Sequence, residues 1–214
     1  MKKIILPFLF IILSTCIYSQ QVADLFKKSD VKITYLGIDF SQVKLIGSFN
    51  QFAEAGSTGP SLIKSKYFDS WNNLVVNESK KYDVAWILRK ETINNSIAEV
   101  SEINTKTSLE TIEAENSPNY TIEFIKNYVS TYKFNEKEGF GIIFIAESLN
   151  KNNQEGIFHF VVFNLKTNEI VIQERLVEPA GGIGLRNYWG RTIFEAIRDL
   201  QDNKYKIWKK KYGK

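Results

Sequence analysis

The segment 139–200 decides the fold. It reads GFGIIFIAES at 139–148, GIFHFVVFNLKTNEIVIQERL at 156–176 and EPAGGIGLRNYWGRTIFEAIRDL at 178–200. Two strongly apolar runs, a more polar run, a glycine-rich turn and an amphipathic segment follow one another in that order. We expect the rest of the chain to cover or extend this unit.

Three strands are predicted within this segment. The runs 142–146 and 157–165 are nearly continuous in apolar residues, which is typical of strands buried on both faces of a sheet. The run 170–176 carries Gln, Glu and Arg in succession, so it is expected nearer a sheet edge. The intervening sequences NKNNQE and NLKTNE predict two hairpin turns, and Asn168 is able to take the left-handed conformation.

Further strands are predicted in the N-terminal half. The run 31–39 (VKITYLGID) alternates well enough to predict a strand, and 43–46 is a short continuation. The run 96–104 is another candidate strand.

Helices are predicted wherever apolar residues recur at helical spacing. This spacing is found at 62–79, 82–93, 118–134 and 189–200. The run 82–93 also fits a strand, and we favour the helix. The last helix carries one apolar stripe, formed by Trp189, Ile193, Ala196, Ile197 and Leu200.

These elements predict the fold class. We expect one α/β (α+β) domain at 31–214, with a mixed, largely antiparallel sheet flanked by helices and a basic helix at the C-terminal end. The residues 20–30 are interpreted as a polar leader. The apolar fraction of 43% is ample for one core.

The first nineteen residues, 1–19, have the pattern of a signal peptide. Lys2 and Lys3 precede an apolar run at 4–13, and cleavage after Ser19 is expected. The protein is therefore predicted to be exported, either to the periplasm or to the medium. The apolar run is too short for a comfortable membrane span, and no transmembrane segment is expected in the mature chain.

Cys16, the only cysteine, allows an alternative. The sequence LSTC at 13–16 approximates a lipobox, in which Cys16 would be lipidated and anchor the protein as a lipoprotein. With ordinary cleavage the mature chain has no cysteine, which excludes disulfides, thiolate catalysis and cysteine-ligated metals.

The charge balance does not point to nucleic acid. The formal charge of +4 includes Lys2 and Lys3, and 1–19 carries no acid, so the mature balance is +4 − 2 = +2. A nearly neutral, exported chain has no electrostatic footprint for nucleic acid.

Catalytic and metal chemistry have few candidates. His159 is the only histidine and lies within a predicted strand, and the chain has no Gly-x-Ser-x-Gly motif. We interpret His159 as a core residue and expect no catalytic residue, metal or cofactor. Asp39 and Glu147 are the best candidates for the paired carboxylates of a glycosidase, but acids at strand ends are commonplace.

The glycine-rich turn is the candidate ligand site. It follows a strand and opens a helix, where backbone N–H groups attract anions. It lacks the Lys-Ser/Thr of a P-loop and the third glycine of a dinucleotide fingerprint. The candidate ligand-binding or anion-binding residues are Gly181, Gly182, Gly184, Arg186, Asn187 and Arg191.

Two aromatic stretches are candidates for surface contacts. The sequence NYWG at 187–190 would offer aromatic rings to a glycan or a partner, although the core interpretation is favoured. The tail KYKIWKKKYGK is basic and aromatic, which suits either an anionic envelope surface or a docked terminal helix. The candidate contact residues are Tyr188, Trp208, Lys209, Lys210 and Lys211.

Two resemblances follow from particular stretches. YLGIDFSQVKLIG at 35–47, KYD at 81–83 and GGIGLRNYW at 181–189 resemble an uncharacterised family of exported Gram-negative proteins, which implies no activity. The pattern over 120–200 is also similar to the curli-secretion and penicillin-binding-protein-activator lipoprotein fold. In that fold a D-x-K-T-G-E turn precedes a helix; here Asn164 replaces the Asp and Asn168 the Gly. This similarity implies an α/β envelope domain that works by protein contact.

The sequence thus favours a non-catalytic protein-interaction module of the cell envelope or the secreted fraction. The expected partner is an envelope protein or an anionic envelope surface. The alternative is a small-molecule or anion-binding protein, or a hydrolase, that uses the loop 181–191. That alternative requires a concave pocket at the loop with a perturbed titratable group, whereas an interaction module requires an exposed apolar patch.

Overall fold

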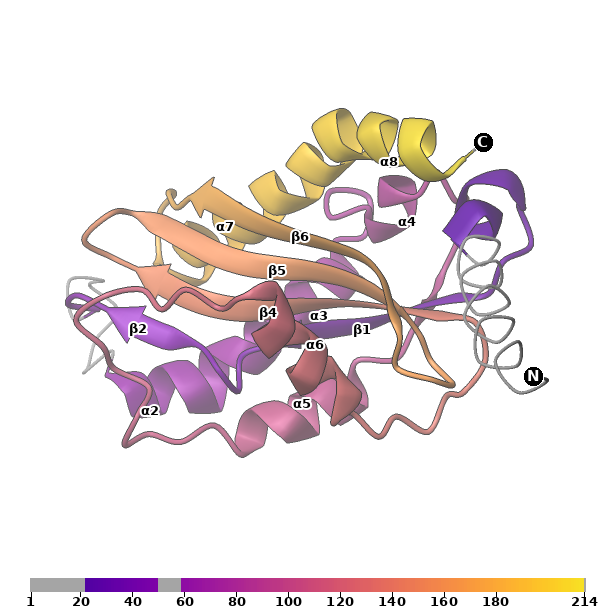
Figure 1. The fold of residues 1–214 in the computed structure, drawn as a ribbon. Helices are drawn as coiled ribbons and strands as arrows, with labels where there is room; N and C mark the ends of the chain where they lie inside the picture. The colour runs from indigo at the N-terminus through magenta and orange to yellow at the C-terminus, as the bar shows by residue number, and fades with distance from the viewer. Residues whose placement is uncertain (1–21, 50–58, 214) are drawn as a thin grey trace, which may run out of the picture.

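The computed structural model describes residues 22–49 and 59–213. Their strands form one six-stranded sheet with the order β3-β1-β4-β5-β6, and β2 pairs with β4 beyond the end of β1. Figure 1 shows this sheet as one twisted layer with helices around it. The fold is therefore the α/β domain with a mixed, helix-flanked sheet that the sequence predicts.

The N-terminal half supplies the parallel part of the sheet. β1 (Ile33–Asp39) pairs in parallel with β4 (Phe140–Asn150), and the short β2 (Lys44–Ile46) continues along the same edge of β4. β3 (Asn94–Asn95) adds a two-residue parallel strand outside β1. The strands predicted from the alternating run and its continuation are confirmed.

The C-terminal half supplies the antiparallel part. β4, β5 (Glu155–Asn164) and β6 (Ile170–Pro179) form two successive hairpins. β4 is buried along its whole length, whereas the outermost strand β6 contains several exposed residues. Asn168 has a φ of 57° in the second turn, so its predicted left-handed conformation is confirmed.

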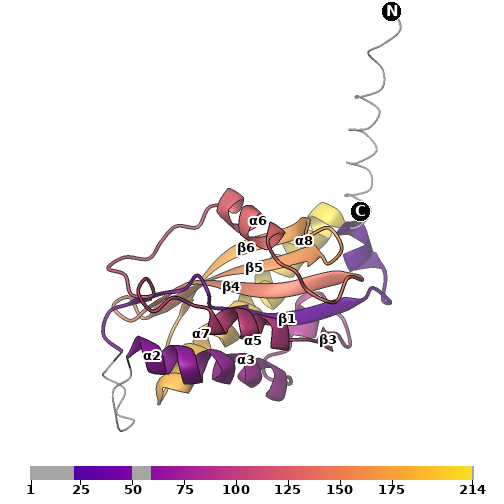
Figure 2. The same ribbon diagram turned by 90° about the horizontal axis from the view of Figure 1, so that it is seen from below.

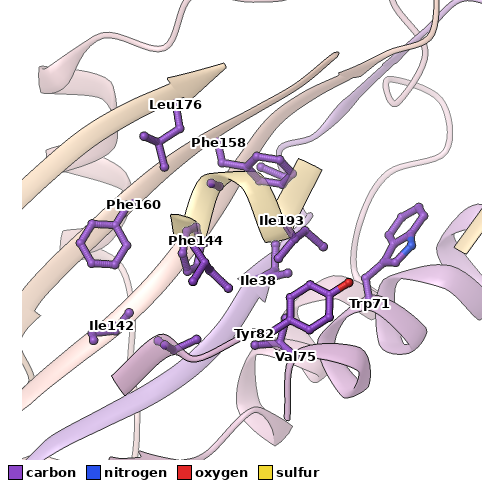
Figure 3. Close-up of a cluster of buried hydrophobic side chains, with 14 of the residues drawn as sticks. Ile38, Trp71, Val75, Tyr82, Ile142, Phe144, Phe158, Phe160, Leu176 and Ile193 are labelled. Carbon is purple, nitrogen blue, oxygen red and sulfur yellow. The ribbon is translucent and has the colours of Figure 1, made fainter. Parts of the chain in front are cut away.

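Two helical segments cover one face of the sheet. The first comprises α2 (Pro60–Leu62), a π-helical turn and α3 (Phe68–Asn77). The second comprises α7 (Leu185–Asp199), another π-helical turn and α8 (Tyr205–Tyr212). Figure 3 shows part of the core that they form with the sheet, including Ile38, Trp71, Val75, Tyr82, Ile142, Phe144, Phe158, Phe160, Leu176 and Ile193.

The opposite face is covered by α6 (Ile122–Ser130), while α5 (Ala98–Thr105) lies beside β1. Figure 2 shows α6 on one side of the sheet and α3 with α7 on the other. This second core contains Leu36, Val100, Ile125, Val129, Tyr132, Phe134, Ile143, Ile145, Val161, Phe163 and Leu165. The strands β4 and β5 therefore bury both faces, as their continuous apolar runs predict.

Three sequence predictions need correction. The strand predicted at 96–104 is wrong, because this run forms α5 and turns Val100 into the second core. The run 82–93 is helical only in the single turn α4 (Val84–Ile87). The helix predicted from Pro118 begins later, because the Thr121 side chain caps it by accepting a hydrogen bond from the Phe124 N–H.

Two buried amides explain why a helix can replace a strand beside β1. The Asn72 side chain accepts from the Ile38 N–H at 2.7 Å and donates to the Ile38 carbonyl at 3.0 Å. The Asn104 side chain accepts from the Phe40 N–H at 2.6 Å and donates to the same carbonyl at 2.9 Å. Side chains of α3 and α5 thus satisfy the backbone that a longer β3 would have paired.

Candidate functional site

The strongest polar cluster lies inside the sheet, under α6. A register shift in the pairing of β4 with β5, between Ala146 and Ser148, marks a β-bulge at Glu147. His159 on β5 pairs with Ile145 on β4 and with Arg175 on β6, so its side chain shares their face. Three strands thereby bring an acid, an imidazole and a guanidinium together.

Hydrogen bonds saturate the Glu147 carboxylate. His159 Nε2 lies 2.7 Å from Oε2, and Arg175 donates from Nη2 to Oε1 at 2.5 Å and from Nε to Oε2 at 3.1 Å. The Tyr120 N–H also donates to Oε2, at 3.3 Å. Burial alone raises the pKa of the Glu147 carboxyl, but the bonds to His159 and Arg175 outweigh it and hold that pKa below its usual range.

The cluster is closed to solvent on its acid and imidazole sides. Glu147 and His159 are 0% and 1% exposed, and the Tyr120 ring lies over the imidazole with a centroid separation of 6.4 Å. The second ring nitrogen of His159, Nδ1, has no hydrogen-bond partner among the described residues. A general base must reach the proton that it removes from a substrate, and the buried Glu147 and His159 are not placed to do so. Their hydrogen bonds are suited instead to holding three strands in register.

The second predicted carboxylate, Asp39, belongs to a separate network. Its Oδ2 accepts from the hydroxyls of Tyr132 at 2.6 Å and Tyr128 at 2.9 Å, and its Oδ1 accepts from the Ser41 N–H. Burial and the Asp39 charge raise the pKa of both tyrosines well above the usual value. Asp39 and Glu147 are both fully buried, which does not suit a carboxylate pair that must admit a sugar and a water.

The glycine-rich turn has the geometry of a tight strand-to-helix connection. Gly182 and Gly184 have φ values of 118° and 79°, which side chains rarely adopt. The Gly181 N–H donates to the Tyr188 carbonyl at 3.0 Å, so it is already used within the turn. A side chain at 181 would meet the guanidinium of Arg191, whose Nη1 would lie 2.8 Å from the added Cβ.

The arginines of this turn are paired with acids. Arg186 donates to Glu78 at 3.0 Å, and Arg191 lies 3.4 Å from Glu195. Five surface hollows of the described residues are lined by other segments, and none of these five includes residues 181–187 or 191. The predicted anion-binding residues are therefore neighbours in space, but their cations already have carboxylate partners.

An acidic hollow lies close to this turn in sequence and in space. It encloses about 210 Å³ and is lined by Glu178, Glu195, Arg198, Asp199, Asp202 and Asn203. Burial, reinforced by the charges of Asp199 and Glu195, raises the pKa of the Glu178 carboxyl to about 7. No three His, Cys, Asp or Glu side chains of the described chain are arranged to hold a metal ion.

Two of the candidate contact residues, Tyr188 and Trp208, lie in the core. Tyr188 is 7% exposed and packs edge-on against Trp189, which is 1% exposed. Trp208 is 2% exposed, stacks on Phe160 at 5.6 Å and donates from Nε1 to Glu174. The lysines at 209, 210 and 211 are exposed, as a docked terminal helix with a cationic outer face requires.

Exposed apolar side chains gather at the start of α6. Ile122 is 76% exposed and Phe124 36%, and the Phe124 ring stacks on Tyr120 with a centroid separation of 4.2 Å. We call Tyr120, Ile122 and Phe124 the α6 patch. Val177, 48% exposed on the outermost strand, projects from the same face of the sheet.

Sequence reasoning did not single out several of these residues. Arg175 and Tyr120 complete the polar cluster. Counting back from the second hairpin turn would have placed Glu174 opposite His159, because a register shift between Val162 and Phe163 moves the pairing by one residue. Ile122 fits the same helical spacing as Ile125 and Val129, but only the latter two are buried.

Comparison of the chain with family models, with curated proteins and with solved structures finds no match. The resemblances to exported Gram-negative proteins and to the curli-secretion fold therefore stay predictions. Within the described ranges, no helix combines the length and the apolar character needed to cross a membrane.

Proposed function

We propose that this protein is a non-catalytic interaction module of the cell envelope or the secreted fraction, which binds a partner polypeptide through the α6 patch. The observation that carries the proposal is the exposure of Ile122, at 76%, beside the stacked rings of Tyr120 and Phe124. Exposed apolar side chains grouped at one end of a helix are a feature of protein-binding sites.

The burial or pairing of the candidate catalytic and anion-binding side chains supports this proposal. The carboxylates of Glu147 and Asp39 are fully buried, and each accepts hydrogen bonds from neighbouring side chains. The two arginines of the loop 181–191 form salt bridges with Glu78 and Glu195. An enzyme or an anion-binding protein would need such groups to converge on an open pocket.

The setting of the patch also suits a protein partner. Glu123 and Lys126 are exposed on the same helix, so charges of both signs surround the apolar side chains. Protein interfaces commonly have an aromatic and apolar centre with a polar rim. The pattern at 1–19 supports export as the route by which the module meets its partner.

Site-specific photo-crosslinking in the intact host tests this proposal. A photoreactive phenylalanine at position 124 is expected to give one dominant crosslinked polypeptide. The same group at Leu109, which is 45% exposed on another segment, is the matched control and is expected to give none. Ile122→Asp should abolish the product at 124, because a carboxylate would have to be desolvated in the interface.

The fold of the variant is checked by thermal unfolding. Ile122 is mostly exposed, so the Asp substitution is expected to change the free energy of unfolding by less than about 0.5 kcal/mol. Products of equal yield at 109 and 124, or a product at 124 that survives Ile122→Asp, would show that the α6 patch is not the contact site.

A further inference from the structure

The outer face of α8 forms a surface of one charge sign. A hollow of about 510 Å³ is lined by Arg89, Tyr205, Lys206, Lys209, Lys210 and Gly213. Four of these six residues are cationic and none is acidic. We call Arg89, Lys206, Lys209 and Lys210 the α8 cations.

This surface is held in place by aromatic contacts. The Arg89 guanidinium stacks on the rings of Trp86 at 4.7 Å and Tyr205 at 4.5 Å, and donates to the Gln201 carbonyl at 2.6 Å. Trp208, on the inner side of α8, anchors the helix to Phe160 and Glu174. The cations are therefore presented by a fixed helix and a clamped arginine.

The lysines of this surface keep their charge available. Lys206, Lys209 and Lys210 are exposed, and none forms a salt bridge with a described residue. By contrast, Lys204, one turn earlier, lies 3.2 Å from Glu174. An unpaired cluster attracts anions more strongly than paired lysines do, because no carboxylate cancels its field.

Apolar side chains flank the cations. Trp86 is 49% exposed and Ile207 is 59% exposed. Lysines with an adjacent tryptophan and isoleucine match the two parts of a membrane interface, which offers anionic headgroups above an apolar layer.

The N-terminal end of the described chain lies beside this surface. Residues 22–27 are helical, and the Phe26 ring packs on Tyr212 at 6.4 Å and on Tyr205 at 5.9 Å. Figures 1 and 2 show this indigo segment next to the C-terminal end of α8. Cys16 lies six positions before Val22 in the sequence. Six extended residues reach at most about 20 Å.

We propose that the α8 cations, with Trp86 and Ile207, bind the surface of an anionic phospholipid bilayer. A lipid on Cys16 would keep this surface within reach of the same bilayer. The inference rests on the export of the protein but not on the α6 patch. The membrane-binding proposal and the α6-patch proposal can therefore be contradicted independently.

Vesicle binding tests this inference with the protein as its host processes it. The probes are vesicles of phosphatidylcholine alone and of phosphatidylcholine mixed with phosphatidylglycerol. Each basic residue at an anionic surface contributes about fivefold to partitioning. The triple variant Lys206→Gln/Lys209→Gln/Lys210→Gln should therefore lose roughly a hundredfold of its partitioning onto the anionic vesicles.

A matched triple variant controls for net charge. Lys126, Lys133 and Lys166 are exposed and lie away from α8. Changing these three to Gln removes the same charge and should leave partitioning within about twofold. Thermal unfolding of both triple variants should match that of the unaltered protein, because none of the six lysine side chains is buried.

Tryptophan quenching locates the contact. The chain has four tryptophans, of which Trp71, Trp189 and Trp208 are at most 2% exposed. Brominated lipid in the anionic vesicles should therefore quench the emission of Trp86, and the triple variant Lys206→Gln/Lys209→Gln/Lys210→Gln should lose this quenching at the same lipid concentration.

Three results would overturn the inference. The first is equal partitioning onto neutral and anionic vesicles. The second is an equal loss of binding in both triple variants, which would assign the effect to net charge. The third is binding to a soluble polyanion such as polyphosphate without binding to the anionic vesicles.

Discussion

His159 Nε2 lies 2.7 Å from Glu147 Oε2, and both side chains are essentially excluded from solvent. The acid is also held by Arg175 of β6, so charge-assisted hydrogen bonds join β4 to its neighbour β5 and, across β5, to β6. A lone histidine beside a carboxylate would suggest a general base in an open cleft. Here the same pair fixes the register of β4, β5 and β6.

Glu147 should make the fold sensitive to acid. Its folded-state pKa lies below the usual range, so the unfolded chain binds a proton first as the pH falls. The stability it contributes is present above about pH 4.3, the ordinary glutamate value, and is lost as the pH falls through the folded pKa. Urea unfolding of the unaltered protein between roughly pH 6 and 3 should show a steeper decline than Glu147→Gln.

Glu147→Gln should also lower the free energy of unfolding at neutral pH. Removing one partner of a buried pair typically costs about 3 kcal/mol, so Glu147→Gln should be less stable at neutral pH. Parallel pH profiles for the two proteins would contradict the assignment of Glu147 as an ionised, hydrogen-bonded carboxylate.

Glu178 should have the opposite effect on pH dependence. Burial and the charges of Asp199 and Glu195 raise its folded pKa to about 7, above the ordinary glutamate value. The folded state therefore binds more protons than the unfolded state between about pH 4.3 and 7, and stability falls as the pH rises through that window.

Glu178→Gln removes this titration and should stabilise the protein at pH 8 but not at pH 4. We expect a gain on the order of 1 kcal/mol, reduced from the full electrostatic value because the side chain is only partly buried. Asp202→Asn, in the same hollow, is the control for loss of one negative charge. Equal gains at both pH values would mean that Glu178 does not titrate in this window.

Asn72 should be more important than its size suggests. Its amide is fully buried and bonds both backbone groups of Ile38 and the Phe68 carbonyl. Asn72→Ala leaves the Ile38 N–H without this acceptor and should cost about 2–4 kcal/mol in urea unfolding. Asn203→Ala removes an exposed amide that bonds Asp199 and should cost less than about 0.5 kcal/mol.

The C-terminal unit was predictable because its signals are local. The continuous apolar runs of β4 and β5, the polar edge strand β6 and the turn around Asn168 all follow from neighbouring residues. The stripe of Trp189 and Ile193 on α7 is local in the same sense. The structure agrees with the sequence on each of these points.

The strand predicted at 96–104 failed because the competing interactions are distant in sequence. Asn72 and Asn104 take over the backbone pairing of β1 from 34 and 64 residues away. The periodicity of apolar residues within 96–104 does not show that these amides take the place of a neighbouring strand. The polar cluster was hidden for a related reason, since the bulge at Glu147 sets which face its side chain joins.

The surfaces were predictable only in part. The basic tail identified the exposed lysines, but Arg89 comes from a different segment and joins them through aromatic stacking. Tyr188 and Trp208 were candidates for surface contacts, with packing in the core as the alternative, and both rings are buried because aromatic residues at helical spacing serve the core as readily as a binding face.

Carbethoxylation of His159 tests most directly the claim that the polar cluster is a closed structural element. His159 is the only histidine of the chain, so imidazole modification by diethyl pyrocarbonate reports a single site. The folded protein should resist modification, and reactivity should appear together with global unfolding as urea is added. Rapid modification of the folded protein, at the rate of a free imidazole, would place His159 in an open cleft and contradict the account.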